Sequence, residues 1–293
     1  MGSGKSFDDQ MKNVSLVLVN HHFSTSSIRP FVANMIEIGG IHVEPVKELP
    51  KDLQKFLDEA TEGVILFSMG SIIKGKDWET KKREAFVKAF GKLKQKVLWK
   101  YENETLPKNP GNIMISSWIP QRDVLAHPNV KLFITHGGLL GTTEALVEGV
   151  PVLGIPIYGD QEMNMIKAQD LGYGILMNLV DIDDDLVEKN LRKVLTIPKF
   201  THNAKEISNR FNDRPMTPQE STVYWVEYVI RHRGAPHFQS PAHNLTYLQL
   251  NLIDVYTFLV VISLLILIVA YRTFKFVLVI FKNILIDKKI KVL

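Results

Sequence analysis

The chain has 293 residues, 45% of them hydrophobic and 23% charged, which predicts a folded protein of about two domain-sized units. The formal net charge is +4, but six Lys or Arg residues and one acid, Asp287, lie from Arg272 onward, so residues 1–271 carry about −1. This argues against nucleic acid as a partner, because a nucleic-acid binder spreads cations over a folded face. The absence of cysteine excludes disulfides, thiolate metal sites and cysteine nucleophiles.

The first residues contain Gly-Ser-Gly-Lys-Ser, which invites comparison with a phosphate-binding loop. That motif needs a glycine five positions before Gly4, where only Met1–Ser3 precede it. We therefore interpret this stretch as a flexible chain end. No apolar run follows it, so no cleavable signal peptide is expected in this chain.

Apolar runs rich in β-branched residues alternate with helical patterns along the first two-thirds of the chain. Near-continuous apolar runs are typical of strands buried on both faces, and their alternation with helices predicts a doubly wound parallel α/β sheet. The predicted strands are 14–20, 63–69, 96–101, 113–118, 132–135 and 151–155. The predicted helices are 78–93, a short one after Pro120, 142–148 and 161–171, followed by three that pack on or beside the sheet, 183–195, 203–211 and 218–232.

The carboxyl-terminal part has a different pattern. Residues 233–243, with a glycine and two prolines, predict a linker. Residues 255–271 form an uncharged apolar stretch between Asp254 and Arg272, which predicts a transmembrane helix, with a buried core helix as the alternative. Basic residues follow this stretch, so the positive-inside rule predicts a cytosolic tail and an α/β domain on the other side of the membrane.

Polar residues follow four of the predicted strands, at the sheet edge where open parallel sheets bind ligands. The segment that follows the predicted strand 132–135 indicates an anion site. Gly137, Gly138 and Gly141 leave backbone N–H groups accessible where a helix begins near Thr142, at the positive end of its dipole. A tight turn that needs glycine for its conformation is the alternative.

Two side chains near this loop extend the anion site to a nucleotide site. His136 adds a donor that can be cationic, and Glu144 can accept hydrogen bonds from a vicinal diol such as ribose. A phosphate attached to a ribose indicates a nucleotide. The glycine spacing does not match the dinucleotide fingerprint, which disfavours a nucleotide-dependent oxidoreductase.

Two other strand ends carry candidate ligand contacts. Trp118 could stack its indole face on a base, with core packing as the alternative. Asp160 and Gln161 offer one carboxylate and one amide, which suit paired sugar hydroxyls. Capping of the following helix is a competing or additional role for Asp160.

Together these residues resemble the signature of the membrane UDP-glycosyltransferases, the family of the UDP-glucuronosyltransferases. The resemblance extends over nearly the whole chain, is closest to invertebrate members, and corresponds to the carboxyl half of such an enzyme. It rests on Trp-Ile-Pro-Gln at 118–121, His-Pro at 127–128, Phe-Ile-Thr-His-Gly-Gly at 133–138, Glu-Ala at 144–145, Gly-Val-Pro at 149–151, Pro156, Asp-Gln at 160–161, Asn-His-His-Phe at 20–23, Gly-Gly-Ile-His at 39–42 and Phe-Ser-Met-Gly-Ser at 67–71.

The resemblance implies the Rossmann-like, donor-binding half of a GT-B glycosyltransferase with one membrane helix. It implies a single-pass protein of the endoplasmic reticulum membrane with a lumenal donor domain. Lys289 and Lys291 fit a cytosolic retrieval signal, with positive-inside charge alone as the alternative. The expected parts are the end of the amino-terminal half with the interdomain linker at 1–60, the donor domain at 61–233, a linker at 234–254, the transmembrane helix at 255–271 and a basic cytosolic tail at 272–293.

The resemblance also implies a role for each site residue. Trp118 would stack on uracil, Gln121 and Glu144 would bind ribose, and Ser71 would lie near the phosphates. His136 and the amides that follow it would hold the diphosphate, while Asp160 and Gln161 would hold the transferred sugar. These amides belong to the loop and helix start that contain Gly137, Gly138, Gly141 and Thr142.

The donor would be a UDP-sugar, with no separate cofactor and no metal. Many relatives have Asn and then Ser or Gly where this chain has Leu140 and Gly141, so phosphate contacts there would come from the backbone alone. The Gly-Leu-Leu run resembles invertebrate members, which favours UDP-glucose over UDP-glucuronic acid. Asp181 and Asp183 resemble a metal-binding pair, but acids also favour a helix start, and we interpret them so.

The implied reaction is an inverting displacement in which the hydroxyl of a small lipophilic acceptor attacks the anomeric carbon and UDP leaves, as in detoxification. The family's base, a His oriented by an Asp, belongs to the amino half, so no catalytic residue is expected in this chain. The alternative is a truncated, non-catalytic partner that binds UDP-sugar or regulates a full-length transferase. Assembly into a homo- or hetero-oligomer is a further alternative.

Overall fold

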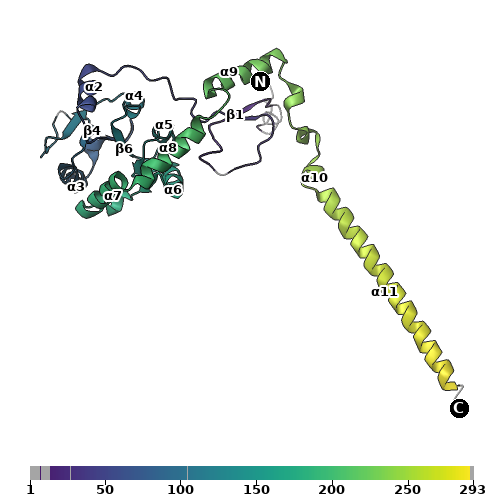
Figure 1. The fold of residues 1–293 in the computed structure, drawn as a ribbon. Helices are drawn as coiled ribbons and strands as arrows, with labels where there is room; N and C mark the ends of the chain where they lie inside the picture. Colours follow the sequence, from purple (N-terminus) through teal and green to yellow (C-terminus); the bar gives the residue numbers. More distant parts are fainter. Residues whose placement is uncertain (1–6, 8–13, 27, 104, 291–293) are drawn as a thin grey trace, which may run out of the picture. The chain divides into compact units, whose positions relative to one another are not determined.

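The computed structural model describes residues 7, 14–26, 28–103 and 105–290. The chain divides into two units, one of residues Leu16–Ala235 and one of Met1–Ser15 with Pro236–Leu293 (Figure 1). The Gly-Ser-Gly-Lys-Ser stretch and Lys291 lie outside the described residues.

The larger unit is built on a six-stranded sheet in which every pair of neighbours is parallel. Its order, β5-β4-β3-β6-β7-β8, reverses direction between β3 and β6, which confirms the doubly wound sheet. The strands are β3 (Val64–Ser68), β4 (Lys96–Lys100), β5 (Ile113–Ser116), β6 (Val130–Thr135), β7 (Val152–Gly154) and β8 (Gly174–Leu176).

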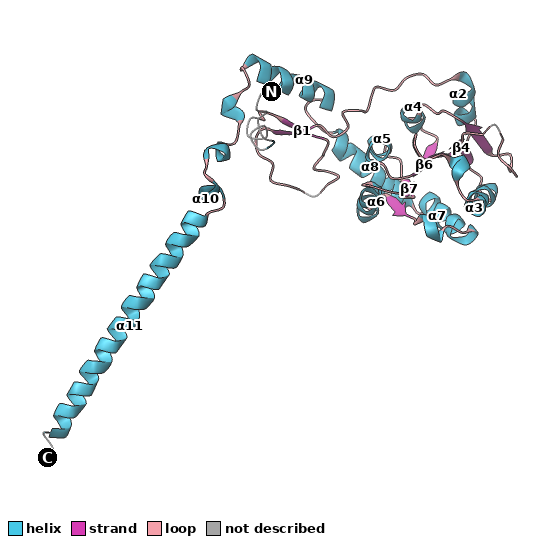
Figure 2. Cartoon of the chain, turned by 180° about the vertical axis from the view of Figure 1, so that it is seen from behind, coloured by secondary structure: helices cyan, strands magenta, loops and turns pink. Residues whose placement is uncertain are grey.

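Helices cover both faces of this sheet (Figure 2). Side chains of β3 alternate between the two layers, since Ile65 and Phe67 pack into one buried cluster and Val64 and Leu66 into the other. The first cluster includes α3 (Thr80–Gly91) and α7 (Asp184–Thr196). The second includes α2 (Lys51–Asp58), α4 (Gln121–Leu125), α5 (Leu139–Val147), α6 (Gln161–Asp170) and α8 (Pro198–Asn212).

Aromatic side chains form much of the first cluster. Phe67 stacks on Trp99 of the neighbouring strand with ring centroids 4.7 Å apart, and Phe86 lies 4.9 Å from Phe67. All three side chains are almost completely buried. Because Phe67 lies one residue before the end of β3, this packing holds the strand end that leads into the candidate site.

The first predicted strand, 14–20, does not join the six-stranded sheet. Only β1 (Val17–Val19) is a strand there, and it pairs in parallel with β2 (Met35–Glu37), which was not predicted. Strands this short carry too weak an alternation to be recognised, and the partner of β1 is a local segment rather than the central sheet.

Two of the predicted helices begin at other residues than expected. Helix α5 begins at Leu139 rather than Thr142, directly after the glycine pair, and α8 begins at Pro198, a residue suited to the first helical turn. Helix α9 (Pro218–Arg231) lies where the sequence predicts it and has no buried side chain.

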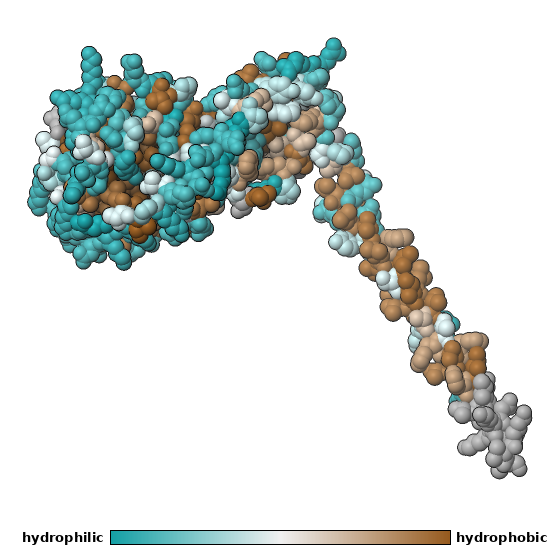
Figure 3. All heavy atoms as spheres, in the orientation of Figure 1, coloured by the Kyte–Doolittle hydropathy of each residue, from teal (hydrophilic) through white to brown (hydrophobic). Residues whose placement is uncertain are grey.

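The smaller unit contains α10 (Tyr247–Leu250) and the long helix α11 (Ile253–Ile290). The helix continues beyond the predicted span, and its part from Ile253 to Lys282 is exposed throughout. Arg272 and Lys275 lie within this helix. Figure 3 shows hydrophobic residues along this helix, which by length and composition is a candidate membrane span.

One buried histidine makes the stability of the larger unit depend on pH. The His22 ring packs between Phe23 and Phe211, with centroids at 4.3 and 4.5 Å, and the Ser24 N–H donates to its Nδ1 atom. Burial, with the charge of Arg214, lowers the pKa of His22 to about 4. The unfolded chain takes up this proton near pH 6.5 and the folded chain only near 4, so the free energy of unfolding should fall as the pH drops between these values.

We expect His22→Gln to make the free energy of unfolding less dependent on pH between 6.5 and 4. Urea unfolding at several pH values would measure this slope separately from any constant loss of stability. His202→Gln, which changes an exposed histidine of α8, is the matched control. A slope that His22→Gln leaves unchanged would show that His22 is not the group that titrates.

Candidate functional site

The candidate site lies where the ends of β3 and β6 meet. Ser68 pairs with Thr135 at the last position of both strands, so the loops that follow them begin side by side. A Cβ atom on Gly70 would lie 2.8 Å from the His136 ring, and one on Gly138 would lie 2.4 Å from it. The His136 ring is therefore held between two glycines, and a larger residue at either position would displace it.

Two adjoining cavities open at this edge, with volumes of about 410 and 450 Å³. Both are lined by Gly70, Ser71, Gln121 and Glu144. Trp118 lines the first cavity, while His136, Gly138, Gly141 and Asp160 line the second. The structure thus brings together eight of the eleven predicted site residues; the other three, Gly137, Thr142 and Gln161, line neither cavity.

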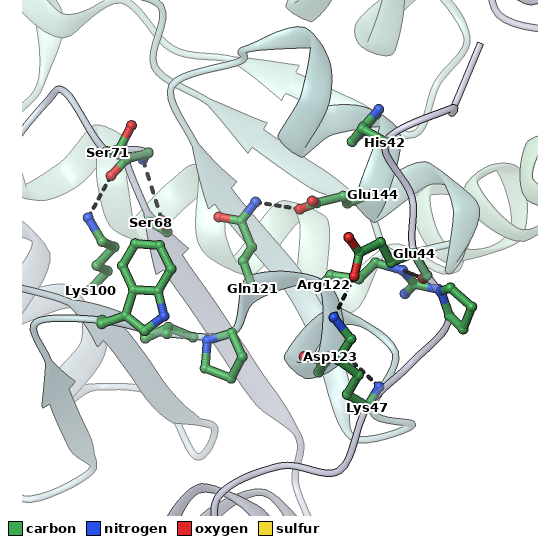
Figure 4. A pocket seen from close by; sticks show the side chains of 15 residues that line it. His42, Glu44, Lys47, Ser68, Ser71, Lys100, Gln121, Arg122, Asp123 and Glu144 are labelled. Carbon is green, nitrogen blue, oxygen red and sulfur yellow. Dashed lines mark hydrogen bonds and ion pairs between the residues drawn. The ribbon is translucent and has the colours of Figure 1, made fainter. Parts of the chain in front are cut away.

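A hydrogen bond between α4 and α5 crosses the site. The Gln121 side-chain amide donates from Nε2 to Oε2 of Glu144 over 2.7 Å (Figure 4). The two side chains point toward each other and form one polar group made of a carboxylate and an amide carbonyl. Such a group can accept hydrogen bonds from two neighbouring hydroxyls.

Trp118 lies just after β5 and is 71% exposed, so the alternative of a core tryptophan is wrong. The Ser116 hydroxyl donates to the Trp118 carbonyl over 2.6 Å and fixes the backbone at this point. An exposed indole at the rim of a polar cavity is suited to stacking on a planar ligand.

The amino-terminal end of α5 points its N–H groups at the second cavity. Its N-cap, Gly138, has no side chain to cap the helix. The N–H groups of the first helical residues, Leu139–Gly141, have no carbonyl acceptor within the helix. These residues line the second cavity. Their N–H groups and the helix dipole can therefore hold an anion there.

Gly137 and Thr142 support this helix start rather than the cavity surface. Gly137 has φ +83°, and a Cβ atom there would lie 2.7 Å from Met165, so only glycine fits. Thr142 is buried, and its hydroxyl donates to the Gly138 carbonyl over 2.9 Å.

The surroundings of His136 disfavour its cationic form in the ligand-free protein. Burial lowers the pKa of its imidazole, and the nearby Asp160 carboxylate offsets only part of this effect. The Nδ1 atom is buried and has no hydrogen-bond partner among the described residues. The ring can still donate one hydrogen bond as a neutral imidazole.

The structure separates Asp160 from Gln161. Asp160 is exposed at the second cavity and accepts a hydrogen bond from Asn164 over 2.9 Å, and its side chain does not cap α6. Gln161 is 4% exposed, and its side-chain oxygen accepts from the N–H groups of Ile157 and Tyr158. Gln161 therefore holds the loop that carries Asp160.

One wall of the first cavity comes from a segment that holds none of the predicted site residues. His42, Glu44, Pro45 and Lys47 line the cavity, and His42 donates from Nε2 to the Leu140 carbonyl over 3.0 Å across 98 positions of sequence. Contacts between positions so far apart leave no local pattern. We call residues 39–47 the wall segment.

Lys100 is a second lining residue that the sequence analysis missed. Its side chain is 11% exposed, and its ammonium donates to the Gly70 carbonyl over 2.7 Å (Figure 4). Lys100 is the last residue of β4, so the rule that ligands bind at strand ends could have found it.

The two acids that resemble a metal-binding pair have structural partners. Asp183 caps α7 by accepting from the Leu186 N–H over 2.7 Å, and Asp181 accepts from Asn178. Within the described part of the chain, no group of three or more His, Asp and Glu side chains is placed to hold a metal ion.

We expect the pKa of the His136 imidazole to lie below 6.5 in the ligand-free chain, because burial disfavours its charged form. NMR titration of the imidazole signals, assigned with His136→Gln, would measure it. Asp160→Asn should lower this pKa further, because the Asp160 carboxylate favours the charged ring. A pKa of 6.5 or higher, or an increase in the Asp160→Asn variant, would contradict this description.

Comparison with known proteins shows the family and the fold of this chain. The sequence model of the family described as "UDP-glucoronosyl and UDP-glucosyl transferase" matches residues 1–292. The chain is 46% identical over 260 residues to "UDP-glycosyltransferase UGT5" of Dactylopius coccus, covering 89% of this chain and 49% of that protein. It is 35% identical over 260 residues to "UDP-glucuronosyltransferase 2B13" of Oryctolagus cuniculus, covering 88% and 49%. The chain thus spans about half the length of the curated relatives it matches.

Solved structures show the same fold. The "UDP-glucose: anthocyanidin 3-O-glucosyltransferase in complex with UDP" superimposes with a TM-score of 0.56 at 22% identity, covering 64% of this chain and 45% of that one. Os79 from O. sativa in complex with UDP gives a TM-score of 0.54 at 21% identity, covering 62% and 44%. These neighbours are GT-B glycosyltransferases. The chain belongs to the family of UDP-glucuronosyl and UDP-glucosyl transferases and has the α/β fold of GT-B enzymes.

Proposed function

We propose that this chain binds a UDP-sugar and supplies the donor site of a UDP-glycosyltransferase. The observation that carries the proposal is the convergence of an exposed indole, a carboxylate–amide pair and a helix amino terminus around two adjoining cavities. These three features match the three parts of a nucleoside diphosphate, which are a planar base, a diol and an anion.

The nucleotide would lie across both cavities. Uracil stacks on Trp118, the ribose hydroxyls bond to Gln121 and Glu144, and the diphosphate reaches the first N–H groups of α5 with His136 beside it. Ser71 lines both cavities and lies on the phosphate side. The hexose then extends toward Asp160 in the second cavity, with Gln161 holding the loop beneath it.

The reaction proposed for the complete enzyme is an inverting transfer to a small lipophilic acceptor. A base removes the proton of the acceptor hydroxyl, whose oxygen forms a bond to the anomeric carbon, while the bond from that carbon to the UDP oxygen breaks. The α5 N–H groups and His136 stabilise the departing diphosphate. We assign the base to none of the lining residues, because His42 bonds to the Leu140 carbonyl and His136 is enclosed by glycines.

We propose UDP-glucose as the preferred donor over UDP-glucuronic acid. The support is the resemblance of the Gly-Leu-Leu run at 138–140 to invertebrate members and the similarity to proteins of Dactylopius coccus, one of them a "UDP-glucosyltransferase 2" that is 43% identical over 254 residues. A partner that binds UDP-sugar without turnover would use the same cavities. Turnover by the enzyme, rather than binding, separates these two functions.

We propose that α11 anchors the protein in the membrane of the endoplasmic reticulum as a single pass. Its apolar stretch, Ile253–Lys282, is long enough to cross a bilayer. Basic residues toward its carboxyl end favour a cytosolic tail and a lumenal donor domain.

Calorimetry of the chain with UDP tests the nucleotide site. Trp118→Ala should weaken binding by about 1–3 kcal/mol through the loss of base stacking. Glu144→Ala should weaken it by about 1.5–3 kcal/mol through the loss of hydrogen bonds to a charged acceptor. Glu206→Ala, on the exposed surface of α8, should leave binding unchanged. If both site variants bind UDP like the parent, the nucleotide site is wrongly placed.

A second measurement tests the sugar contact at Asp160. Asp160→Asn should leave the affinity for UDP unchanged but reduce the additional affinity for UDP-glucose by about 0.5–1.5 kcal/mol, because an amide accepts fewer hydrogen bonds than a carboxylate. Asp170→Asn, at the other end of α6, is the control. An equal loss for both ligands would mean that Asp160 supports the fold instead.

A further inference from the structure

Helix α4 needs outside contacts to hold its position. It has only five residues, Gln121–Leu125, and its N-cap, Pro120, makes no side-chain hydrogen bond. A helix this short has little stability of its own, so tertiary contacts decide where it lies. Because α4 carries Gln121, these contacts also decide where the Gln121 amide meets Glu144.

The Arg122 side chain makes such contacts on two sides. One guanidinium nitrogen, Nη1, lies 2.7 Å from Oε1 of Glu148, and Nε donates to the Glu44 carbonyl of the wall segment over 3.2 Å. The side chains of Arg122 and Glu148 are 16% and 23% exposed. Figure 4 shows Arg122 beside Glu44. The contact with Glu148 is an ion pair rather than an aligned hydrogen bond, because Nη1 has no hydrogen-bond partner among the described residues.

The Arg122–Glu148 ion pair joins the same two helices as the Gln121–Glu144 hydrogen bond. Gln121 and Arg122 are consecutive on α4, while Glu144 and Glu148 are one helical turn apart on α5. Glu148 is the C-cap of α5, where the helix dipole is negative and a cation is favourable. The two helices are therefore joined by two adjacent contacts, one facing the ligand and one behind it.

We propose that Arg122 is a positioning residue of the nucleotide site, which acts through Glu148. The ion pair holds α4 against α5 at the spacing at which Gln121 and Glu144 meet at 2.7 Å and together receive the ribose hydroxyls. This inference rests on the proposed function. It predicts that loss of the pair specifically weakens recognition of ribose, with stacking of the base left in place.

The test compares the affinities of the full chain for UDP and for 2′-deoxy-UDP by calorimetry. The ratio of the two measures recognition of the 2′-hydroxyl and does not depend on how much protein is folded. Arg122→Gln and Glu148→Gln should each lower this ratio about 3- to 10-fold. The double variant should lower it no further than the more affected single variant, because both changes break one contact.

Two further variants complete the design. Arg122→Lys keeps the charge but loses the planar fork that reaches two partners, so its ratio should be intermediate. Arg210→Gln breaks an Arg–Glu contact of the same length, 2.7 Å, in which both side chains are largely exposed, and should leave the ratio unchanged. If Arg122→Gln does not fold, Glu148→Gln and Arg122→Lys carry the test.

The outcomes separate this inference from the proposed function. A parent chain that binds neither nucleotide overturns both. A parent that prefers UDP, but in which Glu144→Gln leaves the ratio unchanged, overturns the assignment of the ribose contacts. A ratio that falls in Glu144→Gln but not in the Arg122 and Glu148 variants, or that falls additively in the double variant, overturns the positioning role alone.

Discussion

The pairing of β3 with β6 is the constraint on which the candidate site depends. Ser68 and Thr135 end their strands side by side at the point where the order of the sheet reverses. The connections that leave two such strands diverge to opposite sides of the sheet, and they open a crevice at its carboxyl edge. The His136 ring lies at this crevice between Gly70 and Gly138, so the two loops are fitted to each other.

The electrostatics of this crevice favour dipoles over full charges. Burial lowers the pKa of His136, and the Lys100 ammonium donates to the Gly70 carbonyl and lies 3.8 Å from Glu102. An anion in the second cavity therefore meets mainly the N–H groups at the start of α5. Such groups are fixed by the helix and need no rearrangement when a charge develops on a departing diphosphate.

Much of the fold and part of the site could be predicted from the sequence, because short stretches of neighbouring residues carry the pattern. Buried strands such as Val64–Ser68 are continuous apolar runs, and Trp118, Glu144 and Asp160 lie just after strands or at a helix start. Gln161 lies outside both cavities because its amide oxygen accepts from the N–H groups at 157 and 158, an arrangement that only the folded loop determines. The wall segment, the Arg122 contacts and the exposure of α9 depend on residues far apart in sequence, and no local pattern encodes them.

Amide hydrogen exchange of the full chain, with and without UDP, tests the central claim most directly, since that claim is that one nucleotide contacts both α4 and the start of α5. We predict slower exchange on UDP binding at Leu139–Gly141 and at Ile119 and Gln121 together, with no change in α2 at Lys51–Asp58, which lines neither cavity. Protection confined to one of the two segments, or found in α2 instead, would contradict the account.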